Sequence, residues 1–202
     1  MLVAHDKNRE QAMRLTSEQS LVLIVDMQAG LLPVIEHGDQ AAREAGWLGE
    51  LAMSIDVPVW LTEQYPQGLG GSEPALLEAL PNCRVWQKLH FDAHAEPEFA
   101  EALKASERRQ IVICGTEAHI CVMQTGLGLL EAGYEVYWVV EASASRRAAE
   151  ATLAKERMVQ AGAVAVSADM VAYEWLHRCD DERFKQAHRR FLKPRASRAL
   201  DF

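Results

Sequence analysis

SLVLIVD, at residues 20–26, is a continuous apolar run that ends in an acid, and QIVICG, at residues 110–115, is a second apolar run of strand length. Neither run alternates cleanly between apolar and polar residues, which is typical of strands that are covered on both faces. Four more short apolar segments lie at residues 57–62, 84–88, 134–140 and 163–167. Together these runs predict the strands of a buried sheet.

Helix-like segments separate the predicted strands. They lie at residues 39–54, 97–106, 118–132, 146–161 and 168–178. Gly133 and Gly162 follow two of them, where glycine is favoured as a C-terminal cap. Alternating strands and helices indicate parallel strands with right-handed crossovers. We therefore expect an α/β fold with a doubly wound, six-stranded parallel sheet, helices on both faces, and three α/β/α layers.

The chain length of 202 residues indicates one domain with short appendages. We expect an N-terminal extension at residues 1–18, the folded domain at residues 19–192, and a basic tail at residues 193–202. The tail is predicted to be loose or to reach a neighbouring subunit. Residues 65–81 are rich in Gly and Pro and predict a long surface loop with a short helix.

The charge, the apolar runs and the cysteine spacing of the chain indicate which kinds of partner to expect. A net charge of −8 argues against nucleic acid. No apolar run is long enough to cross a bilayer, and the polar N-terminus lacks the apolar core of a secretory signal. The cysteines form no CxxC pair and no zinc-site spacing with histidines. We therefore expect a cytoplasmic protein that has neither a nucleic acid nor a membrane as its partner.

Reactive side chains follow the predicted strands. Asp26 ends the first strand, Gln64 the second and Lys88 the third, and Cys121 lies in the first turn of the helix after the fourth. Ligands bind at the carboxyl ends of parallel strands, so an acid, a base and a thiol are expected to converge there.

The position of Cys121 favours a reactive thiol, because the N-terminus of a helix stabilises a thiolate and can hold an oxyanion. A buried structural cysteine is the alternative. Asp26 is a candidate general base, with an Asx turn or a helix cap as the alternative. Lys88 is a candidate partner for Asp26, with an ordinary solvated lysine as the alternative.

Three longer motifs carry a family resemblance: LIVDMQ at residues 23–28, LTEQYPQGLG at 61–70, and CGTEAHICVMQT at 114–125. They resemble the isochorismatase-like cysteine hydrolases, and in particular the isochorismatase-domain proteins. LEAGYEV at 130–136 and SASRR at 143–147 continue the match, which spans residues 21–170.

The resemblance implies a catalytic triad of Asp26, Lys88 and Cys121 on a six-stranded parallel sheet. It also implies a non-proline cis peptide at Thr116–Glu117 that turns a backbone N–H towards the oxyanion. Five further residues are expected at the oxyanion or in the substrate pocket: Gln64, Phe91, Glu117, Ala118 and His119.

We expect no metal and no cofactor. The nicotinamidase branch of this family carries an Asp/His metal site, but no Asp-x-His occurs between Asp26 and Lys88. His90 and His94 would share a helix face, yet their segment follows a strand and precedes Pro97. The glycines at residues 68–71 lack the spacing of a dinucleotide fingerprint, which argues against a nucleotide-dependent oxidoreductase.

The sequence therefore predicts a hydrolase that cleaves an amide-type C–N bond of a small molecule through a thioester. Two alternatives stay open: a vinyl-ether hydrolase that needs only Asp26 as its acid, and a catalytically silent binding or scaffold protein. The apolar stretch at residues 122–130 exceeds what one sheet face needs and indicates a homo-oligomer.

Overall fold

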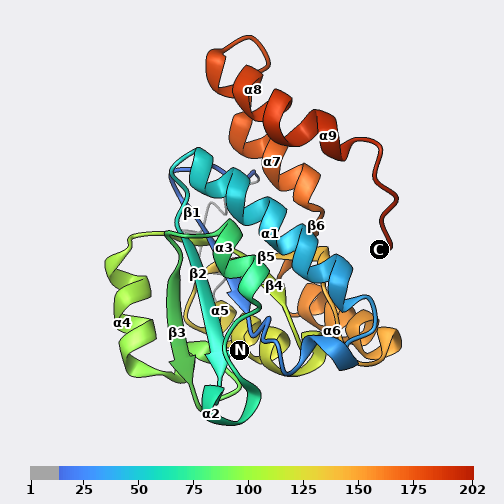
Figure 1. The fold of residues 1–202 in the computed structure, drawn as a ribbon. Coiled ribbons are helices and arrows are strands. Elements are labelled where there is room, and N and C mark those ends of the chain that lie inside the picture. Colours follow the sequence, from blue (N-terminus) through green and yellow to red (C-terminus); the bar gives the residue numbers. More distant parts are fainter. Residues whose placement is uncertain (1–13) are drawn as a thin grey trace.

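The computed structural model describes residues 14–202, so most of the predicted N-terminal extension lies outside the described residues. The described residues contain a six-stranded, all-parallel sheet with the strand order β3-β2-β1-β4-β5-β6 (Figure 1). Its strands are β1 (Ser20–Val25), β2 (Val59–Gln64), β3 (Arg84–Lys88), β4 (Gln110–Gly115), β5 (Glu135–Ser143) and β6 (Val164–Val166). The predicted doubly wound α/β fold is confirmed.

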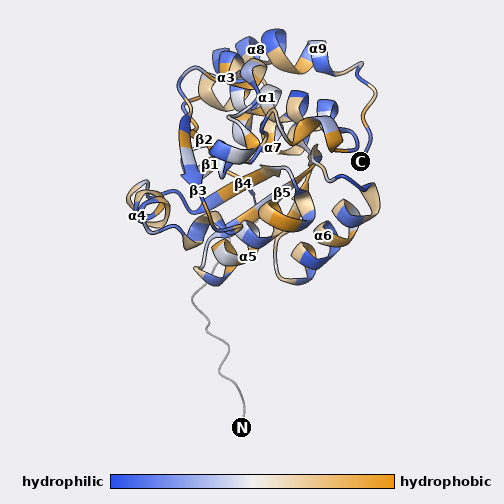
Figure 2. Cartoon of the chain, turned by 60° about the horizontal axis from the view of Figure 1, so that its bottom comes forward, coloured by the Kyte–Doolittle hydropathy of each residue, from blue (hydrophilic) through white to orange (hydrophobic). Residues whose placement is uncertain are grey.

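Helices cover both faces of this sheet. Residues of α1 (Gly38–Ser54) and α7 (Ala168–Leu176) pack in one hydrophobic cluster. Residues of α4 (Pro97–Ala105), α5 (Met123–Glu131) and α6 (Ala148–Gln160) pack in a second cluster on the other face. Figure 2 shows the hydrophobic colours of β4 and β5 between these two layers.

The central strand β1 explains the absence of alternation in its sequence. All six residues are buried. Val22 and Ile24 belong to the cluster under α1, whereas Leu21 and Leu23 belong to the opposite one. A strand in this position needs apolar side chains on both faces. The strand order reverses between β1 and β4, so their carboxyl ends flank the crevice in which such folds bind ligands.

Several predicted segments differ in detail. Residues 65–81 form two short helices, α2 (Pro66–Leu69) and α3 (Pro74–Ala79), where one was predicted. The helix predicted at residues 118–132 begins as a π-helical turn, η3 (Ala118–Val122), before α5. Gly133 and Gly162 have φ values of 91° and 112°, as C-terminal caps require. Two single 3₁₀ turns are η1 (Leu32–Val34) and η2 (Ala93–Ala95).

The prediction of a loose C-terminal tail is wrong at its beginning. The segments α8 (Glu182–Ala187), η4 (His188–Leu192) and α9 (Lys193–Arg195) follow each other directly. Arg195 is only 2% exposed. Its guanidinium pairs with Glu44 at 2.9 Å and Glu141 at 2.8 Å. These ion pairs hold the start of the predicted tail against α1 and β5.

Among the described residues, no helix combines the length and the apolar character that a membrane span requires.

Candidate active site

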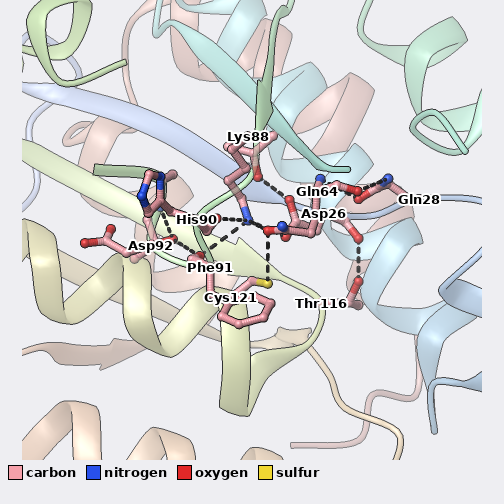
Figure 3. Close-up of polar contacts among 12 residues, drawn as sticks. Asp26, Gln28, Gln64, Lys88, His90, Phe91, Asp92, Thr116 and Cys121 are labelled. Carbon is pink, nitrogen blue, oxygen red and sulfur yellow. Dashed lines mark hydrogen bonds and ion pairs between the residues drawn. The ribbon is translucent and has the colours of Figure 1, made fainter. Parts of the chain in front are cut away.

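The carboxyl ends of β1, β2 and β3 and the start of η3 bring Asp26, Gln64, Lys88 and Cys121 together (Figure 3). Asp26 is fully buried, Lys88 is 3% exposed and Cys121 is 6% exposed. The Lys88 Nζ lies 2.8 Å from Asp26 Oδ2. A buried ion pair therefore lies beside the thiol.

Asp26 is held on several sides. It adopts a left-handed backbone conformation with a φ of 50°, which turns the chain directly after β1. Its Oδ1 accepts a hydrogen bond from Thr62 Oγ1 at 2.6 Å, and its carbonyl oxygen accepts one from Thr116 Oγ1 at 2.7 Å. The second carboxylate oxygen therefore faces Lys88 in a fixed orientation.

Lys88 uses all its donors within the protein. A lysine ammonium group has three protons and no acceptor. The Lys88 Nζ donates to Asp26 Oδ2, to Gln64 Oε1 at 2.6 Å, and to the carbonyl oxygens of His90 at 3.3 Å and Phe91 at 3.4 Å. This arrangement fixes Lys88 as the positive partner of Asp26 and leaves it no spare proton for a substrate.

Hydrogen bonds hold both the side chain and the backbone of Gln64. Its Nε2 donates to the carbonyl oxygen of Leu89 at 2.8 Å, so its Oε1 points to Lys88. The same Oε1 lies 3.9 Å from the sulfur of Cys121. Gln28 holds the backbone of Gln64 through two hydrogen bonds, of 2.8 Å from Gln64 N–H and 3.0 Å to Gln64 carbonyl.

The thiol of Cys121 is not activated in this state. Burial raises its pKa, the charge of Asp26 raises it further, and Lys88 offsets only part of this effect. The direction is opposite to the one predicted from the helix N-terminus. The resting group is therefore a protonated thiol with a carboxylate nearby to accept its proton.

The loop before η3 is held by contacts with Ala144 and Arg146. The Thr116–Glu117 peptide bond is cis. The N–H of Ala118 donates to the carbonyl oxygen of Ala144 at 2.8 Å, so it is not free for an oxyanion. The Glu117 carboxylate forms an ion pair with Arg146. Burial raises the pKa of Glu117, but its hydrogen bonds with Arg146 outweigh burial and the net pKa is lowered.

His119 makes similar contacts with the β5–α6 connection. Its Nδ1 lies 2.9 Å from Ser145 Oγ, and its Nε2 lies 3.2 Å from Glu150 Oε2. Glu117 and His119 therefore tie the nucleophile loop to α6, and their side chains have no direct bond to the Cys121 sulfur among the described contacts.

Phe91 contributes to the site mainly through its backbone. Its carbonyl oxygen accepts from Lys88 and from Thr125 Oγ1. Its side chain is 51% exposed, and Leu89 and Tyr65 nearby in the strand-end loops are 71% and 52% exposed. These three side chains give the loops around the site an apolar surface.

A cavity of about 310 Å³ adjoins Lys88 between β3 and the start of α4. Its walls include Thr62, Trp86, Ala93 and Phe99. Both residues that hold the Asp26 carboxylate, Thr62 and Lys88, thus line it.

Residues 14–202 contain no group of three His, Cys, Asp or Glu side chains that could hold a metal ion. The His90 ring instead lies 2.9 Å from Glu96. The sequence analysis did not single out Gln28, Thr62 or Thr116, although Gln28 lies within the first quoted motif.

Comparisons with known proteins agree with this picture. The isochorismatase domain model matches residues 20–170. The chain is 30% identical to isochorismatase domain-containing protein 2 of Xenopus laevis over 182 residues, which are 90% of this chain and 87% of the relative. It is similar to the MAR1 ribonuclease of Caenorhabditis elegans, with a TM-score of 0.83, 30% identity, and coverage of 89% and 92% of the two chains. It is also similar to an octameric hydrolase of unknown specificity from Escherichia coli, with a TM-score of 0.80, 26% identity, and coverage of 94% and 99%.

Proposed function

The chain belongs to the isochorismatase family, and we propose that it is a cysteine hydrolase that cleaves an amide-type C–N bond of a small molecule. The observation that carries this proposal is the buried Lys88–Asp26 ion pair, at 2.8 Å, beside the protonated thiol of Cys121. A carboxylate held in this way can accept the proton of a neighbouring thiol.

The proposed reaction begins when Asp26 takes the thiol proton of Cys121. The sulfur attacks the substrate carbonyl carbon, and the backbone N–H of Cys121 holds the oxyanion. Asp26 then protonates the leaving amine, and a thioester remains. Water, deprotonated by Asp26, hydrolyses the thioester and restores the thiol. Lys88 balances the charge of Asp26 throughout.

The decisive variant is Cys121→Ala. We expect turnover of small amides to fall by at least a thousandfold, because alanine lacks the nucleophilic sulfur. The melting temperature should stay unchanged, because the substitution removes only this one heavy atom. Mass spectrometry of the wild type during turnover should show an acyl adduct on the peptide that contains Cys121. Full activity of the alanine variant would exclude this mechanism.

Vinyl-ether hydrolysis is the second candidate. The raised pKa of Cys121 favours it, because acid chemistry at Asp26 needs no thiolate. Cys121→Ala separates the two candidates: a vinyl-ether hydrolase keeps its activity on a vinyl ether, whereas a cysteine hydrolase loses its activity on an amide.

A small substrate fits the site better than a polynucleotide. Although the Caenorhabditis elegans neighbour is named a ribonuclease, this chain has a net charge of −8, and its nucleophile is only 6% exposed. We further propose a homo-oligomer, which the octameric Escherichia coli neighbour supports, and a cytoplasmic location without a cofactor.

A further inference from the structure

The side-chain oxygen of Gln64 lies between the cation and the nucleophile of the site. Its Oε1 is 2.6 Å from Lys88 Nζ and 3.9 Å from Cys121 Sγ (Figure 3). The residue is 8% exposed, and the hydrogen bond from its Nε2 to the Leu89 carbonyl oxygen prevents the amide group from turning over. The sulfur therefore faces a carbonyl oxygen and not an N–H group.

A carbonyl oxygen can only accept hydrogen bonds. It can receive the proton of a thiol, but it offers nothing to a thiolate, whose negative charge would face its lone pairs. It also takes one of the three Lys88 protons, which are otherwise the nearest donors for a sulfur anion. The charged groups that act on the thiol are Asp26 and Lys88, and the charge of Asp26 raises the pKa of the thiol more than the charge of Lys88 lowers it.

We propose that Gln64 is a positioning residue that keeps Cys121 protonated in the substrate-free protein by holding a Lys88 proton away from the sulfur. The thiol proton then passes from Sγ to the Asp26 carboxylate only as the bond between sulfur and substrate carbon forms. This inference rests on the proposed role of Cys121. It adds a form of regulation, because a thiol that stays protonated in the substrate-free protein does not react with electrophiles other than the substrate.

Two substitutions at Gln64 test the inference through alkylation of Cys121 by iodoacetamide at pH 8, read by peptide mass spectrometry. Gln64→Met has a similar length but no oxygen, so a Lys88 proton loses its 2.6 Å acceptor. Only the longer contacts to the His90 and Phe91 carbonyl oxygens, at 3.3 Å and 3.4 Å, then compete with a thiolate for that proton. For each unit by which the variant lowers the pKa of Cys121, we expect alkylation to become about threefold faster. The thiolate fraction rises about tenfold, and the lower nucleophilicity of that thiolate offsets about threefold of this gain. Gln64→Glu keeps the acceptor and adds a negative charge, so we expect alkylation slower than in the wild type.

The opposite directions distinguish positioning from simple loosening of the site, which would expose the sulfur and accelerate alkylation in both variants. Gln87→Met, at an exposed residue of β3, is the matched control, and the exposed Cys179 is the internal reference. An unchanged or slower rate in Gln64→Met, or a faster rate in Gln64→Glu, would overturn the proposal. Because turnover is not measured, this result is independent of the Cys121→Ala test.

Discussion

Lys88 and Arg195 are both cations with almost no exposed surface, yet their surroundings differ. Lys88 pairs with one carboxylate, Asp26, and also donates hydrogen bonds to Gln64 and to two backbone carbonyl oxygens. Arg195 pairs with three carboxylates: Glu44 of α1, Glu141 of β5 and, at 2.5 Å, Asp169 of α7. It also lies over the ring of Trp47 at 4.4 Å.

The two cations differ in the groups that surround them and in the role that these groups indicate. The Arg195 network joins segments that are far apart in sequence, so it anchors the C-terminal helices. The Lys88 pair lies at the ligand-binding edge of the sheet beside a thiol that still carries its proton. Buried ion pairs are weak evidence for stability in general, so each pair needs its own test.

Removal of the charge of Asp26 should have the largest effect on activity. We expect Asp26→Asn to reduce kcat by a factor on the order of 10²–10⁴, because an amide cannot take the thiol proton. Steady-state kinetics on an amide substrate measures this loss. Asp92→Asn is the matched control, since Asp92 is a half-buried carboxyl that caps η2 and that Lys88 affects only through its charge, as the last of the effects on the Asp92 pKa. Equal losses in the two variants would remove Asp26 from the mechanism.

Removal of Arg195 should instead affect stability. Arg195→Met leaves Glu141 buried without its ion-pair partner and leaves Glu44 with only the more exposed Arg43 and Arg198. Loss of one member of a buried pair costs about 3–5 kcal/mol in the free energy of unfolding. Urea denaturation gives this quantity, and kcat of the folded protein should stay near the wild-type value. Arg198→Met removes a more exposed partner of Glu44, 34% exposed, and should cost less. A normal stability of Arg195→Met would mean that contacts other than the Arg195 ion pairs hold the C-terminal helices, such as the hydrogen bond from Trp47 Nε1 to the Phe191 carbonyl oxygen.

The same comparison explains what the sequence could predict. Asp26, Gln64 and Lys88 end three strands that are neighbours in the sheet, so the fold class alone brings them to one edge. Arg195 could not be assigned in this way, because its partners Glu44 and Glu141 come from segments with no sequence relation to it. Its basic neighbours made the segment look like a solvated tail.

The pKa of the Cys121 thiol shows a second limit of prediction from the sequence. The helix N-terminus was a sound local argument for a low pKa of Cys121. Burial and the nearby carboxylate of Asp26 are tertiary effects that raise the pKa of this thiol, and neither is visible in the sequence around Cys121. Thr62, whose hydroxyl fixes the Asp26 carboxylate, was also missed, because a threonine within a buried strand has no distinguishing pattern.

The smallest predicted effect concerns the loop whose carbonyls hold Lys88. Glu96 Oε1 accepts from the N–H groups of Leu89 at 2.8 Å and His90 at 3.0 Å. We expect Glu96→Ala to lower the hydrogen-exchange protection of these two amides severalfold and Glu96→Gln, which keeps an acceptor oxygen, to lower it less. Equal protection in both variants and the wild type would show that the loop is held elsewhere.

The pH dependence gives the same contact a second test. The backbone hydrogen bond from His90 is the largest of the effects that lower the pKa of Glu96 to about 2, against an ordinary value of 4.5. A carboxyl with a lowered folded-state pKa contributes stability above its unfolded value and loses it as the pH falls through its folded value. Protection of the Leu89 and His90 amides, relative to their intrinsic exchange, should therefore persist at pH 4 and decline towards pH 2. A decline already centred at pH 4.5 would mean that the carboxylate is not bound by these amides in solution.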